Sequence, residues 1–143
     1  MITKEIPKDF ESKFKVVACY VECEGQILLL HRQPEKSEGG KWGLPAGKVD
    51  EGESDTIAMV RELREETGIQ VAEEKLELLG TGYVRYPDHD FLYTMYRVRF
   101  PGRLTVRLSP AEHQDFKWVT PEEASRMELV RDQDEALRMV YSV

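Results

Sequence analysis

The segment Arg61–Thr67, RELREET, constrains this chain more than any other stretch. Its glutamates at 62, 65 and 66 lie on one side of an α-helix, because each helical residue turns the chain by about 100°. Glu62 and Glu66 form a like-charged i,i+4 pair, which destabilises an isolated helix by roughly 0.2–0.5 kcal/mol. We therefore expect these carboxylates to have a function that outweighs their repulsion.

The residues at both ends of this segment predict a helix over 54–67. Ser54 is a good N-cap, Asp55 places negative charge in the first turn, and Gly68 suits a left-handed C-cap. One stripe at helical spacing is predicted to face the core: Ile57, Val60, Leu63 and Thr67. The three glutamates would then cover an arc of about 100° roughly opposite that stripe.

The rest of the chain interleaves strand and helix signals. Runs rich in β-forming residues at 13–22 and 26–32 flank Gly25 and predict a hairpin. The polar, glycine-rich segment 33–43 predicts a mobile loop, and 44–49 is short and extended. Further strands are predicted at 76–86, 91–100 and 113–119, and helices at Thr120–Met127 and 132–141. We expect one α/β domain over 1–143, with helices covering a mixed sheet.

Composition narrows the classes of function. The net charge of −7 argues against a general nucleic-acid or membrane-surface binder, which would present a basic face. No apolar run has the length of a signal peptide or a membrane span, so a cytoplasmic protein is expected. Cys19 and Cys23 lack further cysteine or histidine partners at metal-binding spacing, which favours free thiols.

The acidic cluster has two interpretations. A solvated helix face is the commoner use of charge, but such faces alternate signs, whereas this one sets acid against acid. The glycine-bearing loop GLPAGKVDEGE before the helix also places Glu53 at its entrance. Converging carboxylates suit a hard divalent cation such as Mg²⁺, which takes oxygen ligands and is completed by substrate phosphates. A bound cation would remove the repulsion between the glutamates.

The segment Gly47–Ile69, GKVDEGESDTIAMVRELREETGI, resembles the Nudix box. That box reads Gly, five residues, Glu, seven residues, then Arg-Glu-apolar-x-Glu-Glu-x-Gly-apolar, and every fixed position is present. GKWGLPAG before it and HQDFKWVTPEEA after it also resemble stretches common in the family. The resemblance implies an α/β/α sandwich with a mixed sheet. It also implies a hydrolase that cleaves the diphosphate linkage of a nucleoside diphosphate joined to another moiety, such as a nucleotide sugar, ADP-ribose or a modified nucleoside triphosphate.

Carried over by position, the resemblance implies that Glu62, Glu65 and Glu66 ligate Mg²⁺ or Mn²⁺. Arg61 should hold a box glutamate through a charge-assisted hydrogen bond, and the box glycines should shape the turns around the helix. Many relatives have Pro-Gly-Gly where this chain has Pro-Ala-Gly. Ala46 therefore indicates a backbone position that needs no positive φ.

The general base stays open between residues inside and outside the box. Glu62 and Glu53 are the candidates within it, and Glu112 is the distal candidate. His113 could also accept a proton, although a lone histidine near a strand is more often structural. Basic side chains that could stabilise charge on the phosphates are Arg32, Lys41 and Lys48.

The substrate is the least constrained part of the prediction. A nucleobase would stack on an aromatic side chain, and those expected in or beside loops are Trp42, Tyr86, Phe91 and Tyr93. Phe116 and Trp118 are expected in the core. The chain has no asparagine, so it departs from MutT-like enzymes that read a damaged base with one. Tyr86 falls where dinucleoside polyphosphate hydrolases carry a marker residue, which keeps that activity as an alternative.

The expected partner is therefore a small nucleotide rather than nucleic acid or a membrane. A non-catalytic nucleotide sensor on the same fold is the second alternative, but such a domain is expected to lose members of the glutamate set. The sequence leaves open whether the chain forms a homodimer.

Overall fold

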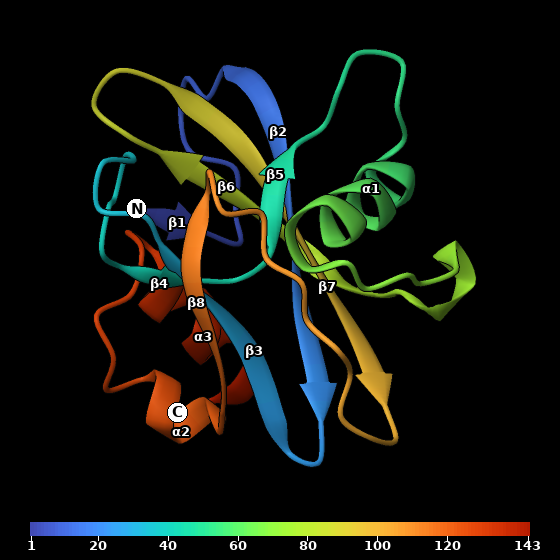
Figure 1. Ribbon diagram of the computed structural model, residues 1–143. Helices are drawn as coiled ribbons and strands as arrows, with labels where there is room; N and C mark the ends of the chain where they lie inside the picture. Colours follow the sequence, from blue (N-terminus) through green and yellow to red (C-terminus); the bar gives the residue numbers. More distant parts are fainter.

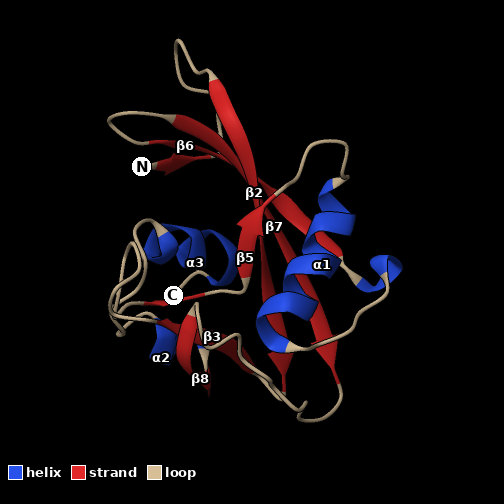
Figure 2. Ribbon diagram, turned by 45° about the horizontal axis from the view of Figure 1, so that its top comes forward, coloured by secondary structure: helices blue, strands red, loops and turns tan.

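A mixed eight-stranded sheet runs between two helical layers in the computed structural model, which describes Met1–Val143 (Figure 1). Helix α1 (Asp55–Thr67) covers one face, and α2 (Pro121–Ala124) and α3 (Gln133–Tyr141) cover the other (Figure 2). The strands are β1 (Ile2–Thr3), β2 (Ser12–Cys23), β3 (Gln26–Arg32), β4 (Trp42–Gly43), β5 (Ala46–Lys48), β6 (Glu77–Arg85), β7 (Asp90–Phe100) and β8 (His113–Val119). This confirms the predicted α/β/α sandwich.

The sheet follows the order β1-β6-β7-β2-β3-β4, while β5 pairs with β2 and β8 pairs with β3. Only β2 and β7 run parallel, and the other pairs are antiparallel. The predicted hairpin joins β2 to β3 through Glu24 and Gly25, with φ of 53° and 78°. Positive φ at both central residues is the turn geometry that fits the twist of a two-residue hairpin.

Side-chain alternation along β2 divides the interior into two apolar clusters. Val17, Cys19 and Val21 point toward α1, where they meet Met59 and Leu63. Ala18 and Tyr20 point to the opposite face, where the cluster includes Ala136 and Leu137 of α3. Both cysteines are buried and free, as predicted. Phe116 and Trp118, predicted in the core, are half-buried and pack against the edge of the α1-side cluster.

The predicted limits of the box helix are confirmed. The Ser54 side chain accepts a hydrogen bond from the Ile57 backbone N–H at 3.2 Å, which satisfies a free donor of the first turn. Gly68 closes the other end with a φ of 75°, a left-handed conformation in which its N–H bonds the Arg64 carbonyl.

The predicted orientation of this helix is wrong in part, because Leu63 and Thr67 are buried as predicted but the buried face is rotated away from Ile57. Its buried residues are Ala58, Met59, Leu63 and Thr67, whereas Ile57 is 48% exposed. At 100° per residue, Glu62 and Glu66 lie within this buried arc rather than opposite it. The helix can turn these carboxylates inward because the Ala46 backbone N–H donates to Glu66 and Arg61 donates to Glu62. Glu65 alone of the three is largely exposed.

Two elements were not predicted, and one predicted loop ends early. The short strand β1 pairs with β6, and Glu73–Lys75 forms a 3₁₀ turn. Trp42 and Gly43, predicted to lie in the mobile loop, form β4 against β3. Strands of two residues carry too little periodic signal to be recognised. No helix has both the length and the apolar character needed to cross a membrane.

His113, at the start of β8, makes folding stability depend on pH. Burial, with the charge of Arg32 adding, lowers the pKa of His113 from 6.5 to about 4. Between these values the unfolded chain binds a proton that the folded chain does not, so the free energy of unfolding falls as the pH falls. Relative to a His113→Leu variant, the wild type should lose up to about 3 kcal/mol between pH 7 and 4. Urea denaturation at each pH measures the free energy of unfolding of both proteins. The same change with pH in the wild type and in His113→Leu would contradict the prediction.

Candidate active site

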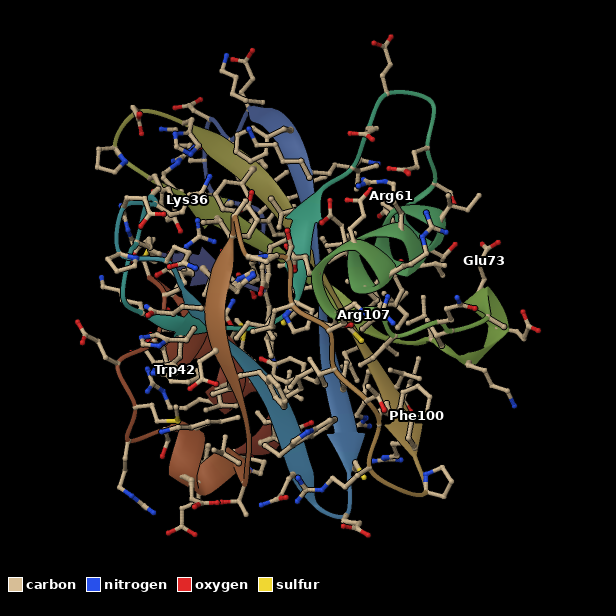
Figure 3. All side chains as sticks on the ribbon, in the orientation of Figure 1. Lys36, Trp42, Arg61, Glu73, Phe100 and Arg107 are labelled. Carbon is tan, nitrogen blue, oxygen red and sulfur yellow. The ribbon has the colours of Figure 1, made fainter.

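The box brings strand β5, the connecting loop and helix α1 around the guanidinium of Arg61. Figure 3 shows this side chain on α1, beside the loop that enters the helix. Arg61 Nε donates to Glu53 Oε2 at 2.8 Å, and Nη2 donates to Glu53 Oε1 and the Lys48 carbonyl, both at 3.0 Å. Nη1 donates to Glu62 Oε1 at 2.8 Å and Glu65 Oε2 at 3.2 Å. Arg61 thus holds β5, the loop and the helix face together.

Glu53 serves as the fixed support of this arginine. Besides the two bonds from Arg61, its carboxylate accepts one from the Asp50 backbone N–H at 2.9 Å. The hydrogen bonds from Arg61 and Asp50 lower the pKa of Glu53 to about 2. A carboxylate so stabilised in its charged form is a weak proton acceptor, which disfavours the predicted role of Glu53 as a base.

Glu62 lies directly against the backbone of Gly47. A Cβ added at Gly47 would stand 2.1 Å from the Glu62 carboxyl carbon, and it would contact both carboxylate oxygens within 2.5 Å. Glycine is therefore needed here for close approach rather than for an unusual backbone angle, since Gly47 is not among the residues with positive φ. Burial raises the pKa of Glu62, and hydrogen bonds from Arg61 oppose that shift.

Glu66 is the most deeply placed carboxylate of the box. Its Oε1 accepts a hydrogen bond from the Ala46 backbone N–H at 2.9 Å. Burial raises the pKa of Glu66 to about 8, the negative charges of Glu62 and Glu112 add to the shift, and Arg32 opposes it. A buried acid with one protein hydrogen bond and acidic neighbours is poorly compensated by the protein alone.

These carboxylates have the chemistry of a hard-cation site, but they are not gathered as one. No three acidic, histidine or cysteine side chains are grouped closely enough to hold a metal ion. Glu62 and Glu65 each give an oxygen to Arg61, while Glu66 turns to β5. The donor set fits a divalent cation because carboxylate oxygens are its preferred ligands, Glu66 forms no ion pair, and Glu65 is 54% exposed with one hydrogen bond at 3.2 Å.

The start of β8 brings a second group of charges to the same place. Arg32 lies opposite His113 in the backbone pairing of β3 with β8, and Glu112 is the residue before His113. The charges of both Arg32 and Glu112 act on the pKa of Glu66. Lys36, which the sequence did not single out, lies 3.8 Å from Glu112. Glu112, the distal candidate base, and Arg32, a candidate phosphate ligand, therefore lie near Glu66 although both are outside the box in sequence.

The other predicted ligand-binding side chains are engaged within the fold. Lys48 Nζ lies 4.3 Å from the centre of the Phe14 ring, and Lys41 pairs with Glu38 at 2.8 Å. Trp42 stacks on the ring of His31 at 4.2 Å. None of these three contacts involves a box glutamate.

Tyr86 lies on the α3 side of the sheet, packed against the cluster that contains Phe91 and Tyr93. The Arg131 guanidinium lies 4.2 Å from the centre of its ring, and Arg131 in turn lies 3.4 Å from Glu38 of the loop before β4. Arg131 had no sequence signal, because only the fold brings the segment before α3 to Tyr86. Cavities of about 430 and 390 Å³ are lined by β6, β7 and their neighbours, and one of about 470 Å³ is lined by residues of segment 1–7; none of the three contains a box glutamate.

Comparison with known proteins assigns the family. The model of the NUDIX domain matches residues 13–140. The chain belongs to the Nudix family. It is 36% identical over 116 residues to the CTP pyrophosphohydrolase of Escherichia coli, covering 77% of this chain and 78% of that protein. It is 33% identical over 124 residues to the RNA pyrophosphohydrolase of Novosphingobium aromaticivorans, covering 72% and 74%.

Solved Nudix structures share the architecture. The solution structure of the E. coli ORF135 protein matches with a TM-score of 0.75 and 29% identity, covering 96% of this chain and 94% of that one. The MutT protein from Methanosarcina mazei Go1 matches with a TM-score of 0.72 and 29% identity, covering 87% and 91%. The predicted class, a Nudix hydrolase acting on phosphoanhydride bonds, is confirmed. Nudix hydrolases generally use divalent metals.

The contact between Gly47 and Glu62 gives a direct test of the site. A Gly47→Ala substitution should displace the Glu62 carboxylate and lower kcat/KM for nucleotide hydrolysis by about 10²-fold, since small misplacements at a reacting centre have effects of that size. Gly102→Ala is the matched control, because its added Cβ meets no atom within 4 Å. Equal kinetics for the two variants would contradict a positioned Glu62.

Proposed function

We propose that this chain is a Mg²⁺- or Mn²⁺-dependent hydrolase that cleaves the diphosphate linkage of a nucleoside diphosphate joined to another moiety. Nucleoside triphosphates are the members of that class to test first, since a relative 36% identical is named a CTP pyrophosphohydrolase. The observation that carries the proposal is the buried, cation-free carboxylate of Glu66 beside Glu62, within an intact Nudix box.

In this proposal Glu62, Glu65 and Glu66 hold the metal. A bound divalent cation would neutralise phosphate charge and lower the pKa of a water molecule, supplying hydroxide near neutral pH. Arg61 keeps Glu62 against Gly47 while Glu53 holds Arg61. Arg32, whose charge acts on Glu66, and Lys36, which pairs with Glu112, are the basic side chains proposed to stabilise charge on the equatorial oxygens of the attacked phosphorus.

Glu112 is our preferred general base. Its side chain is 45% exposed, and its ion pair with Lys36 is long at 3.8 Å, so it can receive a proton from water. Its charge reaches Glu66, which supports a place within the same site. Glu62 remains the alternative, although its hydrogen bond from Arg61 favours a role as ligand.

A series of contacts from Arg32 to Tyr86 supports a substrate that extends beyond its phosphates. Arg32 Nε donates to the Ser37 carbonyl at 2.7 Å, which ties the loop 33–41 to the site. Glu38 of the same loop meets Arg131, whose guanidinium covers Tyr86. The guanidinium plane of Arg131, which is 53% exposed and lies on the Tyr86 ring, is a surface on which a nucleobase can stack. A dinucleoside polyphosphate hydrolase stays the second candidate, because Tyr86 falls at that group's marker position.

Removing one carboxylate should separate catalysis from folding. Glu66→Gln is expected to lower kcat by at least about 10²-fold, because a neutral amide cannot neutralise a divalent cation. The metal-free variant should unfold at the same temperature as the wild type or higher, since burial and the charges of Glu62 and Glu112 already disfavour the ionised form that the amide replaces. Glu74→Gln changes an exposed residue outside the box and should leave kinetics unchanged. Wild-type turnover by Glu66→Gln would remove that residue from the site.

A substrate panel tests the proposed reaction itself. Nucleoside triphosphates, nucleotide sugars, ADP-ribose and dinucleoside polyphosphates are incubated with Mg²⁺ or Mn²⁺ in ¹⁸O-labelled water, and the products are resolved by mass spectrometry. We expect cleavage of a phosphoanhydride bond with label in one phosphate product, which identifies the phosphorus attacked. Binding of these nucleotides without turnover under both metals would support a sensor domain instead.

A further inference from the structure

We propose that Arg61 is the counter-cation of the metal-free site, and that Glu65 leaves its guanidinium when a divalent cation binds. Arg61 therefore weakens metal binding while it stabilises the empty site. This inference rests on the proposed function, since it assumes that the box glutamates are the metal ligands. It assigns Arg61 a role that differs from merely holding those ligands in a metal-ready arrangement.

The hydrogen bonds of Arg61 carry the inference. A guanidinium has five N–H donors, and all five are used here: one on Nε, two on Nη1 and two on Nη2. Both donors of Nη1 go to proposed metal ligands, Glu62 and Glu65. Each of these carboxylates thus has one oxygen bound to a cation that belongs to the protein.

The acidic side chains around Arg61 explain why the empty site needs it. Glu53, Glu62 and Glu65 all contact the one guanidinium, with Asp50 3.5 Å from Nη2. Like charges held this close repel one another in a partly buried site, and a central cation offsets that repulsion. A divalent cation offers the same compensation to the same oxygens, so it competes with Arg61 for them.

The contacts differ in how readily they can be released. Glu53 is bound through two hydrogen bonds at 2.8 and 3.0 Å, and Glu62 is 13% exposed and packed on Gly47. Glu65 has a single hydrogen bond at 3.2 Å and is 54% exposed, so solvent can replace its partner. Release of Glu65 lets Arg61 keep its support on Glu53, and it frees a ligand to join Glu62 and Glu66.

Metal affinity measured without substrate distinguishes the two roles of Arg61. Removing a competing cation should tighten binding, whereas removing a residue that only positions the ligands should weaken it. We expect Arg61→Gln to bind Mn²⁺ about tenfold more tightly than the wild type, as measured from the free Mn²⁺ signal by electron paramagnetic resonance; tenfold is about 1.4 kcal/mol. The metal-free variant should unfold at a lower temperature than the metal-free wild type. Weaker Mn²⁺ binding by a folded Arg61→Gln protein would overturn the proposal.

Arg85 provides the matched control. It also forms a two-bond ion pair with a carboxylate, Nε and Nη2 each lying 3.0 Å from an oxygen of Asp90, but it contacts no box residue. Arg85→Gln should therefore leave the Mn²⁺ dissociation constant unchanged. A tenfold change in this variant as well would show that loss of any surface cation alters affinity, and would overturn the inference for Arg61.

A second measurement uses the wild-type protein and does not depend on a variant folding. During titration with Mg²⁺ alone, the ¹⁵N–¹H signals of the Arg61 Nη1 group should shift and exchange faster with water, while its Nε–H signal stays protected by Glu53. The Arg85 signals should remain in place. Mg²⁺ binding with an unchanged Nη1 signal would refute the release of Glu65, and it would leave the proposed function standing. Failure of both Mg²⁺ and Mn²⁺ to bind, with or without nucleotide, would instead refute the proposed function.

Discussion

The site depends on a single guanidinium set among acidic side chains that would otherwise repel one another. Arg61 bonds the loop through Glu53, the helix through Glu62 and Glu65, and β5 through the Lys48 carbonyl. Lysine could not replace it, because three donors on a point charge cannot satisfy this many acceptors from one plane. The position of helix α1 against β5 and the position of its carboxylates are thus fixed by the same side chain.

Close packing against β5 determines which carboxylates face inward. Gly47 leaves room for Glu62, and the Ala46 N–H receives Glu66. Since β5 pairs with the central strand β2, these backbone groups belong to the rigid sheet. Glu65, with no such partner, remains exposed at the rim. The protein holds two carboxylates in place and leaves the third able to move, an arrangement that suits an ion which must enter and be completed by substrate.

Local chemistry explains what could be predicted from the sequence. Caps at Ser54 and Gly68 define helix α1 within one residue, and the Gly25 turn with its flanking apolar runs defines the β2–β3 hairpin. The face of α1 could not be predicted in the same way. Ile57 and Val60 looked like core residues by type, but the buried arc is shared by Met59, Leu63 and the two inward glutamates. Hydrophobic periodicity misleads where a helix buries charge.

Contacts between distant segments account for the rest of the site. Arg32 and Glu112 come near Glu66 because β8 pairs antiparallel with β3, a register that depends on the whole sheet, and Lys36 joins them only through its ion pair with Glu112. Arg131 reaches Tyr86 because the segment before α3 passes over the end of β6, and no local pattern marks it. Loop 33–41 contacts Arg32 through Ser37 and Arg131 through Glu38. Loop 33–41 thus links Arg32 to Arg131, and both of these residues lie outside the box, so such contacts can vary among Nudix proteins while the box stays intact.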